Sequence, residues 1–251
     1  MQSTASVVLL LFVLLLSPLM CMGALVIYEY DMSDTTCSGT PVLSYAIPTT
    51  CTSWPLPNYP PQYLIATCSA ATNTFSYVQT TNDATCRGSL SPVSGLNTCI
   101  YDPTTPNFRG SYAPFKRACS EAPIATPSPV AVYSLSDSSN CTNVYYQINI
   151  YKPIPSGSNS VCVNGDSYAC GSNGITYSSF AAKDCSSGLS VTGLIPYGYC
   201  NSITWPSLIY PVKIGYSGQK CQGFTSASMM PSANRAIIMF IFGMCVFAFG
   251  I

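Results

Sequence analysis

The chain has 251 residues with 14 cysteines and no histidine, and its 9 basic and 9 acidic residues cancel. Without a basic excess there is no face for nucleic acid, because Lys and Arg must neutralise the phosphates. Without CxxC pairs or histidine there is no zinc site, so we predict no metal and no cofactor, and cysteines oxidised to disulfides in the secretory pathway.

The first predicted element is a secretory signal peptide over residues 1–24. Val7–Leu16 is an unbroken apolar run. Gly23 and Ala24 follow it and are small residues of the kind found at a cleavage site. We therefore expect export of the chain, with Cys21 absent from the mature protein.

A motif of Tyr, Asp and Cys then recurs four times, which indicates a repeated unit. The motif cysteines follow the motif tyrosines by nine, nine, eight and eight positions: Tyr28 and Cys37, Tyr77 and Cys86, Tyr133 and Cys141, Tyr177 and Cys185. The intervening acids are Asp34, Asp83, Asp137 and Asp184. In the first copy we expect a turn in which the Asp34 carboxylate accepts backbone N–H groups and Gly39 supplies a left-handed conformation.

Each motif cysteine is followed by two more, so twelve cysteines form four units of three. The later pairs are Cys51 and Cys68, Cys99 and Cys119, Cys162 and Cys170, Cys200 and Cys221. Three cysteines cannot all pair within one unit, so bridges must join two units of a module or cross between modules. Six cysteines allow fifteen connectivities, and the sequence leaves them open.

The fold class is predicted to be all-β, with two tandem disulfide-rich, sandwich-like modules. The modules span residues 25–121 and 130–222, each an internal duplication of the unit of about fifty residues. Residues 122–129 form a Pro-rich linker between them. Short β-branched and aromatic runs predict strands at Thr74–Val78, Val130–Ser134, Val144–Tyr151 and Ile175–Phe180.

The last predicted element is a glycolipid-anchor signal. Residues 223–235 form a small and polar spacer that contains the candidate anchor sites Ser226 and Ser228, and residues 236–251 form an apolar tail. Small residues, a spacer and a terminal apolar tail are typical of anchor attachment. A retained transmembrane helix is the alternative, but it normally needs about twenty apolar residues and a charged flank.

Two loops share the spacing Trp-Pro-x-x-x-Tyr-Pro and are the candidate binding residues of the chain. They carry Trp54 and Tyr59, then Trp205 and Tyr210. Aromatic side chains with little charge around them suit glycans or a protein partner. The alternative is that both tryptophans cover the small cores. Asn140 lies in the sole N-glycosylation sequon and is a candidate glycan site.

We predict no enzyme activity, because no histidine, phosphate loop or redox motif is present and four of the nine acids repeat as turn residues. Glu29, Asp31 and Asp34 are close enough in sequence for a calcium site, but a solvated turn is the simpler interpretation. The function hypothesis is an anchored protein on the extracellular face of the plasma membrane, with a structural or adhesive role toward glycans or neighbouring surface proteins. The alternative is a carbohydrate or ligand receptor that uses the aromatic loops.

Overall fold

The computed structural model describes residues 23–54, 62–81, 83–104, 107, 111–136, 144–205, 212–221 and 224–225. Several predictions lie outside these residues, namely most of the signal peptide, Tyr59, Asn140, Cys141, Tyr210, Ser226, Ser228 and the tail 236–251. Within the described residues the fold is all-β, as predicted, and no helix there is long and apolar enough to cross a membrane.

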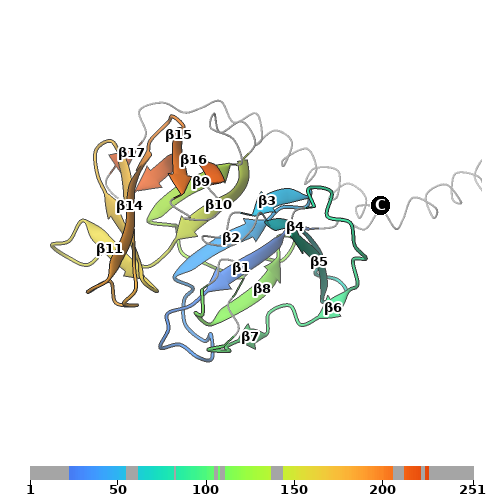
Figure 1. Cartoon of the computed structure of the whole chain (residues 1–251). Helices are drawn as coiled ribbons and strands as arrows, with labels where there is room; N and C mark the ends of the chain where they lie inside the picture. The colour runs from blue at the N-terminus through green and yellow to red at the C-terminus, as the bar shows by residue number, and fades with distance from the viewer. Residues whose placement is uncertain are drawn as a thin grey trace, which may run out of the picture. The chain divides into compact units, whose positions relative to one another are not determined.

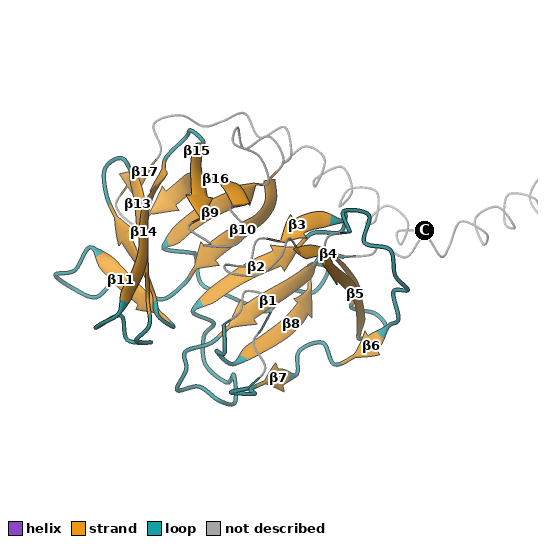
Figure 2. Cartoon of the chain, viewed as in Figure 1, coloured by secondary structure: helices purple, strands orange, loops and turns teal. Residues whose placement is uncertain are grey.

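The strands follow one another along the whole described chain (Figures 1 and 2). The N-terminal half, defined here as residues 23–122, contains β1 (Leu25–Glu29), β2 (Leu43–Ile47), β3 (Thr52–Trp54), β4 (Gln62–Ser69), β5 (Thr74–Thr81), β6 (Val93–Ser94), β7 (Cys99–Ile100) and β8 (Phe115–Cys119). The C-terminal half, defined as residues 130–225, contains β9 (Ala131–Ser136), β10 (Val144–Ile150), β11 (Ser160–Val163), β12 (Asp166–Cys170), β13 (Gly174–Phe180), β14 (Leu189–Pro196), β15 (Asn201–Trp205), β16 (Val212–Cys221) and β17 (Phe224–Thr225). The four strands predicted from β-branched and aromatic runs are confirmed as β5, β9, β10 and β13.

The described strands form three sheets. The largest has nine strands in the order β15-β16-β9-β10-β2-β1-β8-β7, with β17 paired to β16. The other two have the orders β3-β4-β5-β6 and β11-β12-β13-β14. The large sheet therefore takes strands from both halves and is continuous through the antiparallel pair β2 and β10. One buried apolar cluster likewise includes side chains from both halves.

The pairing pattern of β1–β8 is repeated by β9–β16. In each half the first strand pairs with the second and the eighth, the seventh pairs with the eighth, and the third to sixth pair in succession. Each four-strand group consequently mixes strands from two sequence units. The structure therefore interleaves the two units of each half.

The register repeats as well. In every unit, one strand residue lies directly opposite the third cysteine of a unit in the same half: Leu25 opposite Cys119, Phe75 opposite Cys68, Ala131 opposite Cys221, and Ile175 opposite Cys170. These four cysteines are all buried. They therefore mark one equivalent position in each unit, at which the strand faces the core.

This register corrects one detail of the sequence alignment. Three units have a tyrosine two residues after the strand residue that faces the cysteine, whereas the first unit has Ile27 there. The three tyrosines are Tyr77, Tyr133 and Tyr177. Tyr28 is displaced by one residue and so lies on the opposite face of its sheet. Counting backwards from Cys37 gave the wrong alignment because the segment between strand and cysteine differs in length among the units.

The described disulfides all join the two units of one half. They are Cys37–Cys99, Cys51–Cys86 and Cys68–Cys119 in the N-terminal half, and Cys162–Cys185 and Cys170–Cys221 in the C-terminal half. Cys68–Cys119 and Cys170–Cys221 are equivalent in the two halves, have the same sequence separation of 51 residues, and each join two different sheets through the core. These buried bridges fasten the two layers of each half together.

We expect the bridges of the C-terminal half to differ in their contribution to stability. Cys170–Cys221 spans 51 residues and is buried, whereas Cys162–Cys185 spans 23 and is half-buried. Loop entropy gives about 4 and about 3 kcal/mol for the two closures. Loss of the buried bridge also leaves a void, so replacing Cys170 and Cys221 by Ala should lower the free energy of unfolding by about 1–2 kcal/mol more than replacing Cys162 and Cys185. Denaturant unfolding of both double variants measures this, and an equal or reversed order contradicts it.

Candidate functional site

The repeated Asp–Cys turn is the first candidate site. In the first copy, Asp34 Oδ2 accepts the N–H of Gly39 at 2.9 Å, and Asp34 Oδ1 accepts the N–H of Ser38 at 3.1 Å. The predicted acceptor role of this carboxylate is therefore confirmed. The predicted left-handed glycine is wrong, because Cys37 takes the positive φ of 51°. Gly39 instead lets its backbone lie close to the Asp34 carboxylate, since an added Cβ would lie 3.1 Å from Asp34 Oδ2.

The same conformation returns at two other motif cysteines. Cys86 has a φ of 46° and Cys185 a φ of 60°. Residues other than glycine rarely adopt this region, because their Cβ crowds the carbonyl. At all three sites the cysteine N–H closes a short turn onto a carbonyl three residues earlier, at 3.0–3.2 Å. The turn and the bridge together hold the cysteine in this conformation.

The carboxylates of the later turns also accept local N–H and hydroxyl groups. Asp83 Oδ1 accepts the Thr85 hydroxyl at 2.6 Å and the Thr85 N–H at 2.9 Å. Asp184 Oδ1 accepts the Ser186 hydroxyl at 2.7 Å and the Ser186 N–H at 3.0 Å. In both cases these hydrogen bonds hold the pKa of the carboxyl below its usual range. These acids are therefore ionised parts of the turns rather than proton donors near neutral pH.

The second candidate site is the junction between the halves. β10 and β2 pair through Ile148 and Tyr45, Asn149 and Ser44, and Ile150 and Leu43. Beyond the strand, the Tyr151 N–H donates to the Val42 carbonyl at 2.9 Å. A buried hydrogen bond joins Ser44 Oγ and Tyr151 Oη at 2.9 Å. The junction is therefore continuous in its backbone hydrogen bonding and is reinforced by side chains.

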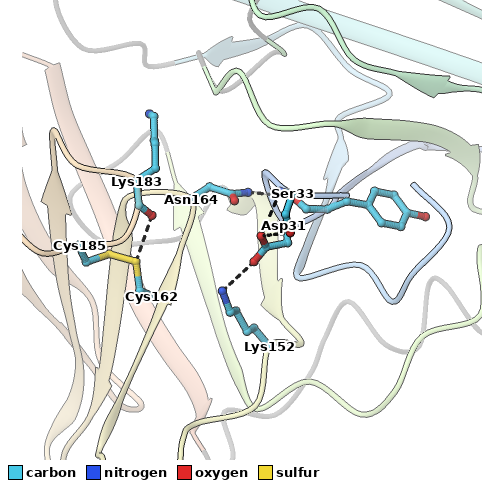
Figure 3. Close-up of polar contacts among 8 residues, drawn as sticks. Asp31, Ser33, Lys152, Cys162, Asn164, Lys183 and Cys185 are labelled. Atoms are coloured by element: carbon cyan, nitrogen blue, oxygen red, sulfur yellow. Dashed lines mark hydrogen bonds and ion pairs between the residues drawn. A yellow bond between two sulfur atoms is a disulfide. The ribbon is translucent and has the colours of Figure 1, made fainter. Parts of the chain in front are cut away.

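Polar side chains complete the junction at the end of β1 (Figure 3). Lys152 Nζ lies 2.9 Å from Asp31 Oδ2, with side chains 36% and 41% exposed respectively. Asn164 Nδ2 donates to the Tyr30 carbonyl at 3.0 Å from the turn between β11 and β12. The C-terminal half therefore holds the segment after β1 through a cation and an amide.

Two pKa shifts report on the same region. The hydrogen bond from Lys152 is the largest cause that lowers the pKa of Asp31; it acts against the opposing effect of burial, and hydrogen bonds from Ser33 add to it. Burial, together with the neighbouring Tyr151, raises the pKa of Tyr28 to about 12. The carboxylate is held ionised and the phenol neutral, as expected of groups that stabilise a packed junction.

The acids considered for calcium are assigned to separate partners. Glu29 is 1% exposed and its Oε1 accepts Asn107 Nδ2 at 2.9 Å. Asp31 pairs with Lys152 and Asp34 accepts N–H groups of its own turn. Within the described residues, no group of three or more His, Cys, Asp or Glu could hold a metal ion. The three carboxylates therefore bind three separate partners and do not share one metal-binding centre.

The tryptophans of the predicted binding loops end strands in different sheets. Trp54 is the last residue of β3 and Trp205 the last of β15. β3 belongs to the sheet β3-β4-β5-β6, whereas β15 belongs to the nine-stranded sheet. The loops that follow, with Tyr59 and Tyr210, lie outside the described residues. The two tryptophans therefore do not belong to one continuous sheet surface.

Other tyrosines lie in the core of the C-terminal half. Tyr168 is fully buried, and its ring lies 5.9 Å from Tyr133 and 5.7 Å from Tyr177, centroid to centroid. Tyr177 Oη also donates to Asp166 Oδ1 at 3.1 Å. Two of the repeated motif tyrosines, Tyr133 and Tyr177, thus pack around Tyr168 and are structural. The large apolar side chains exposed elsewhere in the described residues are Tyr77, Leu90, Val93, Tyr101, Tyr112, Leu189, Leu194 and Tyr199.

Sequence reasoning missed the junction, although one signal for it was present. Asn164 and Gly165 have φ values of 54° and 97° and connect β11 to β12. Asn-Gly between two strands is a strong signal for a tight hairpin. It predicts the turn, but not that the Asn164 side chain would reach Tyr30, which is 134 residues away in sequence.

Comparison with known proteins gives no relative: no family model, no curated protein and no solved structure matches this chain.

The turn carboxylates should make stability depend on acidity. Their folded-state pKa values are depressed, so their contribution is present above the ordinary value of 3.8 and is lost as pH falls through the folded-state pKa. We expect the unfolding midpoint in denaturant to decrease from pH 4 to pH 2. A variant with Asp83→Asn and Asp184→Asn should lose part of that decrease. An unchanged pH profile in this variant contradicts the assignment.

At the junction we expect the buried neutral hydrogen bond to matter more than the ion pair. Tyr151→Phe removes a buried partner of Ser44 and should cost about 1–2 kcal/mol of unfolding free energy. Lys152→Met should cost less than about 1 kcal/mol, because both charged groups are partly solvated and screened. Urea unfolding of the two variants tests this, and a larger loss for Lys152→Met than for Tyr151→Phe contradicts the ranking.

Proposed function

We propose that this chain is a non-enzymatic, glycolipid-anchored protein of the cell surface or coat with a structural or adhesive role. Its many disulfides fit an extracellular or secreted protein. The carrying observation is the junction: strand pairing, a buried hydrogen bond and an ion pair join the two halves into one continuous sheet. Such a braced connection suits a protein that bears mechanical contact.

The proposal includes two tandem modules, each an internal duplication. The repeated pairing pattern and the repeated bridges support it. In the N-terminal half the first cysteine pairs with the fifth, the second with the fourth and the third with the sixth. In the C-terminal half the second pairs with the fourth and the third with the sixth. The duplication predicts that Cys200, which is disulfide-bonded, has Cys141 as its partner.

The chemistry of the described polar groups supports a structural role over catalysis. The acids of the turns and of the junction are hydrogen-bonded to their own backbone or to the other half. None of these carboxylates combines with a nucleophile and a histidine, since the chain has no histidine. We therefore assign the repeated Asp–Cys turns to the framework and the external contacts to exposed strands and loops.

One experiment tests the anchor and the duplication together. Cells that express the full chain are treated with a phosphatidylinositol-specific phospholipase, and the released protein is mapped without reduction. We expect a C-terminus near Ser226 or Ser228, and a peptide that links Cys141 to Cys200 among six bridges. Retention of residues 236–251 in a phospholipase-resistant chain overturns the anchor, and Cys200 linked to another cysteine overturns the duplicated connectivity.

The protein released by the phospholipase, coated on beads, tests the adhesive role. Beads coated with the released protein should aggregate or bind to cells that display it, and beads coated with reduced and alkylated protein serve as the control. Equal behaviour of native and reduced protein contradicts a role that depends on the folded surface.

A further inference from the structure

An arginine without a counter-ion lies between the two layers of the N-terminal half. Arg117 is two residues before Cys119 on β8, so its side chain points to the same core face as that cysteine. Its Cζ lies 4.8 Å from the centre of the Phe75 ring and 5.1 Å from that of Phe115. No ion pair reaches it from any described residue. An enclosed cation without an anion is costly, and contacts with two aromatic rings offset only part of that cost.

The guanidinium is only partly enclosed. Its Nε is buried without a hydrogen-bond partner, but the Arg117 side chain as a whole is half-buried. The two terminal nitrogens are not buried, and no described residue accepts a hydrogen bond from them, so they face solvent. Tyr77, 42% exposed, stacks on the buried Phe75 ring, and Val93, 46% exposed, lies opposite Phe75 in the β5–β6 pair. Arg117, Tyr77 and Val93 thus surround one buried ring and are called the Arg117 surface below.

The equivalent edge of the C-terminal half is covered. Ile195 corresponds in register to Val93, but it is buried. β14 has eight residues and runs past Tyr177, whereas β6 has two and ends before it reaches Tyr77. The Arg117 surface is therefore exposed because the strand that would cover it is short.

The space between the layers is also filled differently in the two halves. By register, Tyr168 of β12 occupies the position of Ala66 of β4. Gly218 of β16 occupies the position of Arg117 of β8. One half therefore places a neutral phenol between its layers and the other places a cation. Since the same framework packs without a charge in the C-terminal half, packing alone does not require Arg117.

We propose that the Arg117 surface binds the carboxylate of an acidic sugar, a uronic or sialic acid. The two terminal nitrogens would donate to the two carboxylate oxygens, and the exposed Tyr77 ring would contact the C–H face of the sugar. The surface carries one cation, which suits a single carboxylate, whereas densely charged polyanions are held by several Lys and Arg. The inference rests on the proposed adhesive function and names a ligand class for it.

Titration calorimetry of the full chain in mild detergent at neutral pH tests the site with matched oligosaccharides. One ends in glucuronic acid and one in sialic acid, and each is compared with its carboxyl-amidated, neutral form. At least one acid should bind at least about tenfold more tightly than its amide, because hydrogen bonds between charged groups are strong. Arg117→Gln should abolish this acid-to-amide ratio. Arg117→Lys should lower it, since an ammonium group lacks the planar pair of donors.

Lys116→Gln is the matched control. Lys116 precedes Arg117 on β8, and its side chain lies on the other face, with Nζ 5.6 Å from the centre of the Tyr30 ring. The same charge is removed, yet the acid-to-amide ratio should stay within about twofold of wild type, because a distant exposed charge is screened. Tyr77→Ala should weaken the acid and the amide by similar factors, because the ring contacts the sugar and not its carboxylate.

Three results overturn the proposal. Acids and amides that bind the wild-type chain equally, or not at all, exclude a carboxylate site, and this comparison needs no variant to fold. An equal loss of the ratio in Lys116→Gln and Arg117→Gln assigns the effect to general charge. An acidic peptide that displaces the oligosaccharide at the same concentration assigns the site to a protein partner. Bead aggregation is measured separately, so oligosaccharide binding without aggregation overturns the adhesive function and leaves the site in place.

Discussion

The buried disulfide between sheets is the constraint on which the rest of the structure depends. Cys68–Cys119 and Cys170–Cys221 each cross the core of one half and lie opposite apolar strand residues. A chain with few charges and many small side chains gains limited stability from burial alone, and cross-links that close loops of this length stabilise it by restricting the unfolded state. With the two layers fastened, the outer turns can carry strained cysteines such as Cys37 without unfolding the strand beside them.

The strand interleaving follows from the same constraint. Each sheet group takes strands from two sequence units, so no unit is complete without its neighbour. The described bridges run between units for the same reason. The junction then applies this logic once more, because β2 and β10 are equivalent edges that pair with each other. One antiparallel pair of equivalent strands therefore joins the two halves into the large sheet.

The polar chemistry of the described chain serves this framework. Carboxylates close turns, Lys152 and Asn164 cross the junction, and the buried Tyr151 phenol shares a hydrogen bond with the Ser44 hydroxyl. Burial raises the pKa of Tyr28, and hydrogen bonds lower those of Asp83 and Asp184, so the charge states suit packing near neutral pH. These polar side chains bind one another within the framework, which agrees with the proposed structural role.

The sequence by itself determined the all-β class, the disulfides, several strands and the acceptor role of Asp34, because alternation, cysteine content and turn chemistry are local signals. It did not reveal the connectivity of the bridges, the left-handed Cys37 or the one-residue displacement of Tyr28. Those depend on which strands become neighbours, and spacing along the chain does not record this when loop lengths vary. The junction of Asp31 with Lys152 and of Tyr30 with Asn164 was decided by tertiary structure alone, since residues more than a hundred positions apart meet only after the two halves join.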